Sequence, residues 1–377
     1  MNTKYNRLFE PFTLKNGVTL KNRMIMAPMT TWSSNDDYTV SDEEVKYYKK
    51  RAAGVGLVIT GCTHVQPNGI GFTNEFAAYD DKFIPSLRKL AEAAKSGGSP
   101  ALLQIFHAGN KALPALTPEG EVVSSSAVET EASAFAPSIL SRALTHKEIL
   151  EVIQAFGETT RRAIEAGFDG VEIHGAHGFL LQNFVSPFFN RREDEWGGSL
   201  ENRLSFSLAV VQEIQNVIKK HAQKPFILGY RFSPEEHIEG GLRMKDTCEL
   251  IDRLIEADID YVHASLASAL SSKPVDNQSE KTYLELIVDH VNDRVPVIAA
   301  GSMVTPDDVK AALDKGISLA AIGHALIMNP NWVELVKDGE EAGIKTSLNR
   351  SKVSDLELPE KLWTLVQASG PWFNITD

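Results

Sequence analysis

One pattern recurs along this chain: a short apolar run, a polar or glycine-rich turn, and then an amphipathic helix. Eight such runs occur, at residues 23–29, 56–60, 101–106, 170–174, 226–232, 261–266, 295–300 and 319–322. They are rich in valine, isoleucine, leucine and alanine, as expected of strands buried on both faces of a parallel sheet. Strands that alternate with helices imply parallel βαβ units. Eight units favour closure into a (β/α)8 barrel, and an open doubly wound sheet is the alternative fold.

Sequence signals also mark where several of the intervening helices begin. Ser41 and Glu44 form a predicted capping box, as do Thr145 and Glu148. In such a box each side chain accepts a hydrogen bond from the other residue's backbone amide. Thr305 is a further predicted N-cap, because a proline occupies the first helical position after it. All three helix starts fall between apolar runs, which supports the alternation of strand and helix.

Three segments depart from the repeat. Residues 12–20 predict a β-hairpin with a type I′ Asn-Gly turn at 16–17, placed to plug the floor of the barrel. Residues 108–144 form a long connection after the third run, and connections of that length are usually functional lids or disordered. We expect residues 1–337 to form the barrel with its hairpin. Residues 338–377 are expected to form an extension packed on the barrel or on a partner subunit.

Charge and cysteine content exclude several classes of function. The 377-residue chain is 43% hydrophobic, enough for a large core, and carries a net charge of −12. This acidic balance argues against a nucleic-acid partner, because phosphate backbones attract a basic field. Cys62 and Cys248 are too few for a four-cysteine zinc site, a cysteine-held iron–sulfur cluster or a disulfide framework. With no apolar stretch near the ~18 residues of a membrane span, we expect a soluble cytoplasmic protein that acts on a small molecule, alone or as a homo-oligomer.

Residues at the ends of the runs are the candidates for function, because barrels of this type carry their reacting groups where strands pass into βα loops. Six runs contribute such residues: Ala27, Pro28, Met29, Thr30 and Trp32 after the first, Gln104 in the third, His174, His177 and Phe179 at the fourth, Arg231 in the fifth, Gly301 and Ser302 after the seventh, and Gly323 and His324 after the eighth. The glycine turns after the last two runs occupy the usual phosphate position of this architecture. Tight turns alone would also explain these glycines.

His174 and His177 form an H-x-x-H pair that allows two kinds of chemistry. The imidazoles are either a pair of hydrogen-bond donors or two metal ligands, with Glu172 available as a third. Satisfied polar residues in a loop would give the same pattern. The chain has no G-x-G-x-x-G or Walker A sequence, which excludes a Rossmann-type dinucleotide site. A nicotinamide cofactor would therefore bind differently and transiently.

Two segments resemble the Old Yellow Enzyme family of FMN oxidoreductases. Residues 22–29 (NRMIMAPM) are similar to the family's first strand, and residues 174–187 (HGAHGFLLQNFVSP) are similar to its fourth strand and the loop that follows. The second match continues through residues 190–203, and the resemblance covers about residues 5–335. It implies a (β/α)8 barrel that binds one FMN and takes hydride from NAD(P)H. It also implies an acceptor that is an activated alkene, a quinone or a nitro compound.

The resemblance assigns a set of residues to FMN. They are Ala27, Pro28, Met29 and Cys62 at the flavin ring, Thr30 at the flavin carbonyl, Gln104 at the pyrimidine edge, Arg231 near N1, and Ala300, Gly301, Ser302, Gly323 and His324 at the phosphate. A fixed cation near N1 stabilises the anionic reduced flavin, which is how a protein tunes this cofactor. Thr30 is expected to tune the flavin potential and is counted with the catalytic residues.

The resemblance gives His174 and His177 the role of holding a substrate carbonyl or phenolate oxygen. Hydride that arrives at the β-carbon of an enone pushes negative charge onto the carbonyl oxygen, and two donors aimed at that oxygen stabilise the charge. Trp32 and Phe179 are expected to complete the substrate site. These assignments make the two histidines catalytic and disfavour a metal.

Two residues depart from the family pattern. Phe179 stands where the family has a tyrosine that protonates the substrate α-carbon, so either alkene reduction is slow, or water or another side chain supplies the proton, or the substrate needs no such proton. His324 stands where the family has an arginine at the phosphate, and histidine is a weaker, pH-dependent partner for an anion. We therefore expect FMN to be held less tightly than in relatives with arginine.

Two other functions remain as alternatives. A metal-dependent barrel hydrolase or lyase would use His174, His177 and Glu172. A binding protein with a degenerate flavin site would keep the pocket without turnover. A yellow protein would argue against the first, and NADH oxidation with a quinone acceptor would argue against the second.

Overall fold

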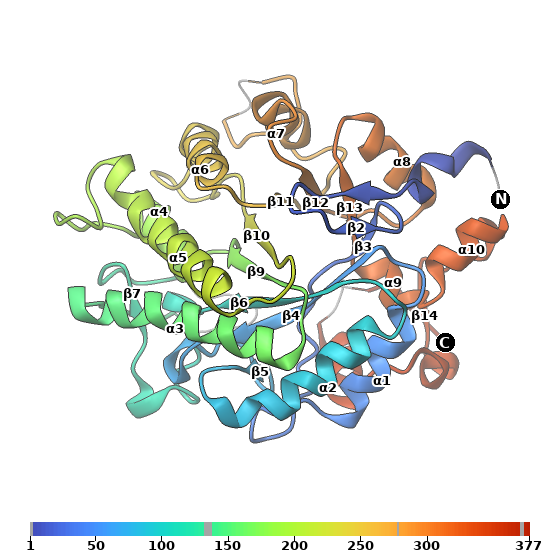
Figure 1. Cartoon of the computed structure of the whole chain (residues 1–377), viewed down its shortest axis with the longest axis horizontal. Helices are drawn as coiled ribbons and strands as arrows, with labels where there is room; N and C mark the ends of the chain where they lie inside the picture. Colours follow the sequence, from blue (N-terminus) through green and yellow to red (C-terminus); the bar gives the residue numbers. More distant parts are fainter. Residues whose placement is uncertain (1–2, 132–137, 277–278, 370–372) are drawn as a thin grey trace.

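The computed structural model describes residues 3–131, 138–276, 279–369 and 373–377 (Figure 1). Eight strands form the barrel: β3 (Met24–Met26), β4 (Leu57–His64), β6 (Ala101–Phe106), β9 (Gly170–Gly175), β10 (Ile227–Phe232), β11 (Tyr261–Ser265), β12 (Val297–Ala300) and β13 (Leu319–Ile322). They are hydrogen-bonded in this order, and all the pairings are parallel. The sheet closes because β3 pairs with both β4 and β13. The predicted (β/α)8 barrel is confirmed, and the open sheet is wrong.

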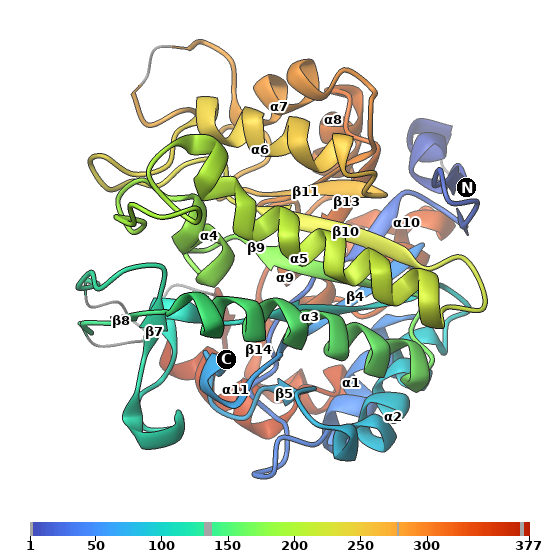
Figure 2. The same cartoon turned by 60° about the vertical axis from the view of Figure 1, so that its left-hand side comes forward.

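Helices cover the outside of the barrel. They are α1 (Asp42–Arg51), α2 (Ile84–Lys95), α3 (His146–Ala166), α4 (Leu180–Val185), α5 (Leu200–His221), α6 (Met244–Glu256), α7 (Tyr283–Val291), α8 (Pro306–Asp314), α9 (His324–Met328) and α10 (Trp332–Asp338). The long helices α3 and α5 lie side by side along one flank (Figure 2). The predicted caps are confirmed, since Ser41 and Thr145 form capping boxes with Glu44 and Glu148, and Thr305 caps α8. Among the helices of the described segments, none has both the length and the apolar character needed to cross a bilayer.

The strands are buried on both faces, which explains why their sequences show no polar alternation. Every residue of β4, β6, β9 and β10 is buried. Ile25, Leu57, Leu102, Ile227 and Leu319 pack against one another in one cluster, and a second, larger cluster joins the strands to the helices. Apolar side chains therefore pack on both faces of the sheet, and the rim of the barrel is the place for polar functional side chains.

The N-terminal hairpin consists of β1 (Phe12–Thr13) and β2 (Thr19–Leu20), which pair antiparallel. The predicted type I′ turn is wrong. Leu14 donates its amide to the carbonyl of Val18, so the loop has three residues, and of these only Gly17 has a positive φ, 89°. A type I′ turn needs positive φ at two residues, and Asn16 instead uses its side chain to accept from the Val18 amide. Leu14 and Leu20 are buried in the interior cluster, which supports the expected plug at the barrel floor.

Strand β4 is longer than its apolar run predicts, and the difference matters for the site. The predicted strand ends at Thr60, whereas β4 continues to His64 through a register shift between Ile59 and Cys62. Gly61 lies in this irregularity, and a Cβ on it would come within 2.5 Å of the Met29 carbonyl oxygen. Glycine therefore lets β4 approach the loop after β3, and the extra residues bring Cys62 to the rim.

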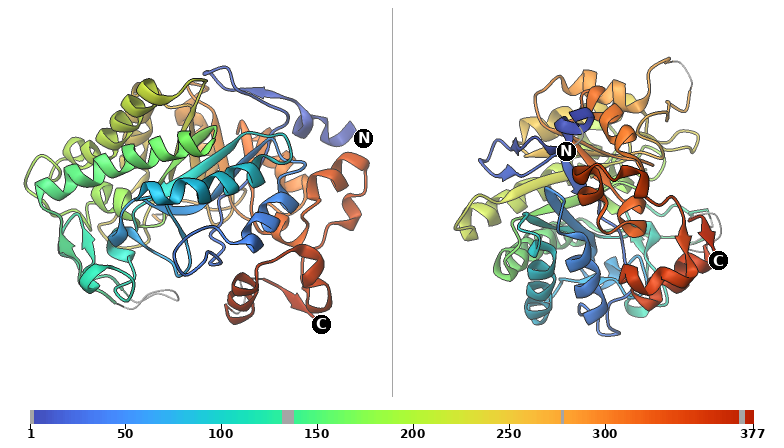
Figure 3. Two further views of the ribbon diagram at one scale, coloured as in Figure 1. Left: turned by 60° about the horizontal axis from the view of Figure 1, so that its bottom comes forward. Right: turned by 90° about the vertical axis from the view of Figure 1, so that its right-hand side faces the viewer.

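In the described residues, the long connection after β6 and the C-terminal extension contain short elements. The connection after β6 holds β7 (Val123–Ser124) and β8 (Arg142–Ala143), while the extension holds β14 (Leu348–Asn349), α11 (Glu360–Ala368) and β15 (Ile375–Thr376). The remaining elements are β5 (Phe76–Ala77) beside β4 and 3₁₀ turns at Thr3–Phe9, Pro67–Gly69, Asp81–Phe83, Gly109–Lys111, Pro118–Gly120, Glu341–Gly343 and Arg350–Leu356. Leu362 and Val366 of α11 are buried in the larger cluster, on the side of the barrel away from the hairpin (Figure 3).

Candidate functional site

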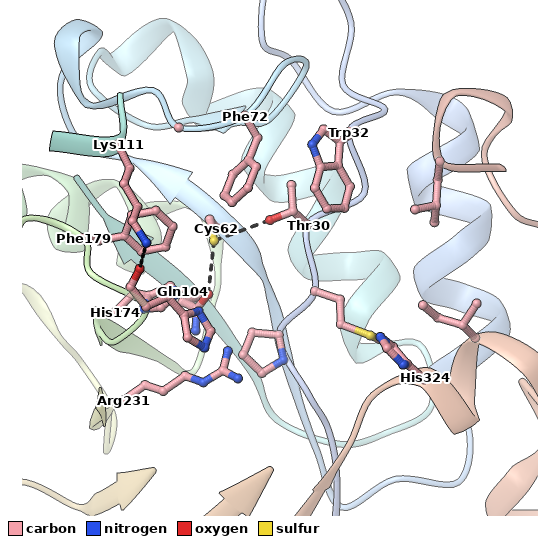
Figure 4. Close-up of a pocket in the computed structure, with 16 residues that line it drawn as sticks. Thr30, Trp32, Cys62, Phe72, Gln104, Lys111, His174, Phe179, Arg231 and His324 are labelled. Carbon is pink, nitrogen blue, oxygen red and sulfur yellow. Dashed lines mark hydrogen bonds between the residues drawn. The ribbon is translucent and has the colours of Figure 1, made fainter. Parts of the chain in front are cut away.

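A cavity of about 490 Å³ lies at the carboxyl ends of the strands (Figure 4). Its wall is made by Pro28, Met29, Thr30, Trp32, Cys62, Gly71, Phe72, Gln104, Lys111, His174, His177, Phe179, Arg231, His324, Ile327 and Leu362. All of these except Gly71, Phe72, Lys111, Ile327 and Leu362 are site residues predicted from the sequence. The structure thus brings together residues from β4, β6, β9 and β10 and from the loops that follow β3 and β13.

Five predicted FMN contacts lie outside the cavity wall as the described residues define it. They are Ala27, Ala300, Gly301, Ser302 and Gly323. A Cβ on Gly301 would come within 2.6 Å of the Ala269 amide nitrogen and 2.7 Å of the Leu266 carbonyl oxygen. Glycine is therefore required here for the close approach of two βα loops. This contact between loops accounts for Gly301 without a ligand, and a phosphate site here stays a prediction.

A row of hydrogen-bonded polar side chains leads from the cavity into the barrel. Thr30 Oγ1 donates to Cys62 Sγ, and Cys62 Sγ donates to Gln104 Oε1, each over 3.5 Å. Gln104 Nε2 donates to Glu172 Oε1 over 2.7 Å. Burial raises the pKa of the Cys62 thiol to about 12, so this sulfur stays protonated at neutral pH. The carboxylate of Glu172 also accepts from the Tyr261 hydroxyl over 2.8 Å, which fixes the deep end of the row.

Arg231 supplies a buried cation with unused hydrogen-bonding capacity. Its Nη2 donates to Ser265 Oγ over 2.9 Å, whereas Nε is buried and has no hydrogen-bond partner among the described residues. Burial holds the pKa of this guanidinium below its ordinary value, but arginine remains charged at neutral pH. The guanidinium lies in the cavity wall (Figure 4), and a cation there fits an electron-rich ring edge such as that of a flavin.

The rings of the two histidines lie next to each other in the cavity wall, edge to face, with ring centres 4.9 Å apart. Burial, together with the nearby Arg231, keeps the pKa of both imidazoles well below the ordinary value, so both are neutral. The Ala176 amide donates to His174 Nδ1 over 3.2 Å, which places the ring proton on Nε2. His177 Nε2 lies 2.7 Å from Ser265 Oγ. The pair therefore consists of neutral imidazoles, and the Ala176 amide sets the tautomer of His174.

Aromatic rings form one wall of the cavity. Phe179 makes edge-to-face contacts with His174 at 4.9 Å and with Phe106 at 5.0 Å. Phe72 lies edge-on to Trp32 at 5.3 Å and to Phe179 at 6.0 Å. The sequence did not predict Phe72, because it lies in the loop after β4 with no motif around it. This wall makes one side of the cavity apolar and aromatic.

Lys111 and Leu362 are the other notable residues that the sequence did not predict. Lys111 ends the 3₁₀ turn Gly109–Lys111, at the start of the long connection after β6. The length of that connection was the only available signal. Leu362 comes from α11 in the C-terminal extension, so the extension contributes to the cavity wall.

His324 lies at the opposite end of the cavity from His174 and Arg231 (Figure 4). Its ring centre is 4.5 Å from that of Phe373, which is buried. Burial lowers the pKa of His324, so it is neutral at pH 7. The C-terminal tail therefore packs on the residue that replaces the family arginine, whereas the neighbouring Trp372 lies outside the described residues.

The metal-dependent alternative does not fit this geometry. Within the described residues there is no group of three histidine, cysteine, aspartate or glutamate side chains able to hold a metal ion. Glu172 accepts hydrogen bonds from Gln104 and Tyr261 inside the barrel, and its Oε2 lies 2.8 Å from His263 Nδ1. The third ligand that this alternative requires is already engaged elsewhere.

A closed barrel whose rim holds a buried arginine, two neutral histidines and an aromatic wall defines a barrel oxidoreductase of the flavin-dependent class. The chain belongs to the NADH:flavin oxidoreductase / NADH oxidase family, whose model matches residues 7–342. The resemblance to the Old Yellow Enzyme family is thereby confirmed. The protein is an oxidoreductase that binds FMN and takes hydride from NADH or NADPH.

Curated relatives and solved structures agree with this family. The chain is 43% identical over 377 residues to the probable NADH-dependent flavin oxidoreductase YqiG of Bacillus subtilis, with all of both chains covered. It is 40% identical over 371 residues to the NADH:fumarate oxidoreductase of Klebsiella pneumoniae, covering 97% of this chain but only 40% of that longer protein. Morphinone reductase in complex with tetrahydroNAD matches with a TM-score of 0.79 and 25% identity, over 98% of each chain. The family assignment overturns the alternative of a binding protein without turnover.

Proposed function

We propose that this enzyme reduces alkenes conjugated to a carbonyl group, with His174 and His177 holding the carbonyl oxygen. The observation that carries the proposal is the pair of neutral imidazoles 4.9 Å apart in the cavity wall, beside Arg231. Neutral imidazoles can each donate one hydrogen bond without placing a full charge beside the guanidinium. Fumarate, acrylate and morphinone, which appear in the names of relatives, all contain an alkene conjugated to a carbonyl group.

The hydrogen-bond partners of the two histidines leave each ring with one N–H to donate. His174 keeps its Nε2 proton because Nδ1 accepts from the Ala176 amide. The Ser265 hydroxyl accepts from Arg231, and its own proton is then available to His177 Nε2, which leaves a proton on His177 Nδ1. Two N–H donors aimed at one oxygen stabilise the negative charge that develops there during hydride transfer.

FMN, when bound, supplies the hydride that it has received from the nicotinamide. On the protein side, we assign Arg231 to the electron-rich edge of the ring, Gln104 to the pyrimidine edge, and Thr30 with Cys62 to the flavin carbonyl side. Gly301, Ser302, Gly323 and His324 are assigned to the phosphate. The buried cation of Arg231 in the cavity wall supports these assignments, since a cation beside the ring stabilises the anionic reduced flavin.

The direct test follows the absorbance of the purified holoenzyme. Anaerobic NADH or NADPH is expected to bleach the flavin band, and cyclohexenone is expected to restore it with formation of the saturated ketone. Menadione and a nitroarene serve as acceptors that need no protonation at carbon. If menadione restores the bleached flavin band but none of the tested alkenes does, the proposed acceptor class is contradicted. The family assignment would remain intact.

The residue at the phosphate gives a second expected result. His324→Arg is expected to bind FMN about 5–10-fold more tightly at pH 7.5, because a charge-assisted hydrogen bond replaces a neutral one. The affinity of the wild-type protein for FMN is expected to rise as the pH falls through the lowered pKa of His324, because the imidazole then becomes charged. His324→Arg should not show this rise. Fluorescence titration of apoprotein with FMN measures both effects, and His221→Arg at the end of α5 is the control. Equal affinity in wild type and His324→Arg would remove His324 from the phosphate site.

We place the enzyme in the cytoplasm and assign residues 338–377 to the same functional unit as the barrel. Both cysteines are free, which suits a reducing compartment. Leu362 of the extension lines the cavity and Phe373 packs on His324, so removal of the extension would open one side of the site.

A further inference from the structure

The reduction of a conjugated alkene needs a proton as well as a hydride, and Phe179 cannot supply one. Of the described residues that line the cavity, none is a tyrosine, an aspartate or a glutamate. Cys62 is a poor acid, because burial raises its pKa to about 12. The protons of the two histidines are committed to the carbonyl oxygen in the proposed function. The remaining cavity residue with an acidic proton in a suitable range is Lys111.

The fold brings Lys111 to Phe179 by a close contact between two βα loops. Gly109 packs on the start of α4, where a Cβ would come within 2.4 Å of Asn183 Oδ1 and 2.8 Å of Leu180 Cα. The Asn110 amide donates to the same Asn183 oxygen over 3.2 Å. These contacts hold the 3₁₀ turn of the β6 loop against the β9 loop, so the side chain that follows is directed at the H-x-x-H segment.

The ammonium group of Lys111 is fixed at that segment. Nζ donates to the carbonyl oxygen of His177 over 2.5 Å and lies 5.9 Å from the centre of the Phe179 ring. A Cβ on Gly178 would come within 3.0 Å of Nζ and 3.1 Å of Cε, and Gly178 has φ of +73°. Glycine at 178 therefore gives the lysine room beside the phenylalanine. Figure 4 shows Lys111 lying along Phe179, with both on the cavity wall.

We propose that Lys111 is the general acid that protonates the α-carbon of the alkene, in place of the tyrosine that Phe179 replaces. This inference rests on the proposed function. Hydride adds to the β-carbon, and the alkene electron pair moves to form an enolate whose oxygen is held by His174 and His177. As the carbonyl re-forms, the α-carbon takes a proton from Nζ of Lys111. The amine that remains recovers its proton from solvent, so the cycle consumes one hydride and one proton.

The surroundings of Lys111 suit this role. Burial lowers its pKa from the ordinary value, which brings the acid closer to neutral pH, where a general acid is most effective. The charged and titratable groups around it are His174, His177 and Arg231 from β9, its loop and β10, and Glu236 from the loop after β10. Lysine donates only in its protonated form, so alkene reduction is expected to fall as the pH rises through this lowered pKa.

The test compares two acceptors in the holoenzyme. Lys111→Met is expected to slow flavin reoxidation by cyclohexenone by about 10²–10⁴-fold, the usual contribution of a positioned acid. Its reoxidation by menadione should slow far less than its reoxidation by cyclohexenone, because a quinone takes its protons on oxygen. FMN content and reduction by NADH report on any change to the rest of the site. Lys111→Arg keeps the charge but is too weak an acid, so it should be as slow as Lys111→Met with cyclohexenone. Lys147→Met, on the exposed face of α3, is the matched control.

A double variant tests the role of the acid even if Lys111 also stabilises the loop. Lys111→Met/Phe179→Tyr is expected to recover cyclohexenone reduction. The fall of its rate at alkaline pH should move toward the pKa of a tyrosine. Equal slowing with menadione and cyclohexenone, or a raised KM with unchanged kcat, would overturn the proposal in favour of a structural or anchoring role. Wild-type rates in Lys111→Met would also overturn it. A wild-type enzyme that reduces no alkene would instead contradict the proposed function.

Discussion

Replacement of His174 by alanine is expected to slow reduction of a conjugated alkene by about 10²–10³-fold, the effect of removing one donor from a developing oxyanion. The reason is specific to this imidazole, because the Ala176 amide fixes its proton on Nε2. The rate constant for flavin reoxidation by cyclohexenone in a stopped-flow instrument measures the effect. Reduction by NADH reports separately on the preceding half-reaction.

His174→Asn is the matched comparison for this substitution. An asparagine amide still donates a hydrogen bond, so the variant should retain more activity than His174→Ala at similar FMN content. His177→Ala is expected to show a loss similar to that of His174→Ala, since the second donor is aimed at the same oxygen. Wild-type alkene reduction in both alanine variants would rule out the histidine pair as the carbonyl site.

Replacement of Arg231 by methionine is expected to weaken FMN binding by about 10–150-fold, since a hydrogen bond to a charged group contributes about 1.5–3 kcal/mol. Arg231 is 7% exposed, and its Nε has no hydrogen-bond partner within the described parts of the chain. Loss of the cation also destabilises the anionic reduced flavin, so the reduction potential should become more negative. Equilibrium titration of apoprotein with FMN and anaerobic potentiometry measure the two effects.

Arg231→Lys separates charge from geometry at this position. A lysine keeps the cation but not the planar fork of donors, so the potential should recover further than the FMN affinity. Melting curves of the apoproteins control for damage to the fold, because removal of the guanidinium leaves the Glu172 carboxylate without a nearby positive charge. Unchanged affinity and potential in Arg231→Met would place the flavin away from this residue.

The barrel was predictable because each strand is buried on both faces. Continuous apolar runs at 101–106 and 319–322 match β6 and β13 at both ends. Capping boxes at Ser41 and Thr145 were equally clear, since they depend on residues three positions apart. Such local signals are complete within a few residues, and tertiary contacts only reinforce them.

Two local predictions were wrong, the end of β4 and the turn of the N-terminal hairpin. β4 continues past its apolar run because Gly61 allows an approach to the Met29 carbonyl oxygen, which no local pattern encodes. The turn at residues 15–17 has three residues rather than two, because the strand pairing sets its length. The first error depends on a loop far away in the chain, whereas the second depends on the register in which Leu14 pairs with Val18.

The sequence by itself determined the eightfold alternation and most of the rim residues and favoured a closed barrel, since burial patterns and strand-end positions follow from the order of residues along the chain. The pairing of β3 with both β4 and β13 in the structure decided the closure. Only the tertiary structure decided which further side chains reach the cavity. Phe72, Lys111 and Leu362 come from two irregular loops and a C-terminal helix, and no periodic pattern marks their position. The place of Lys111 depends on close packing between loops at Gly109 and Gly178, and that packing exists only after the barrel has closed.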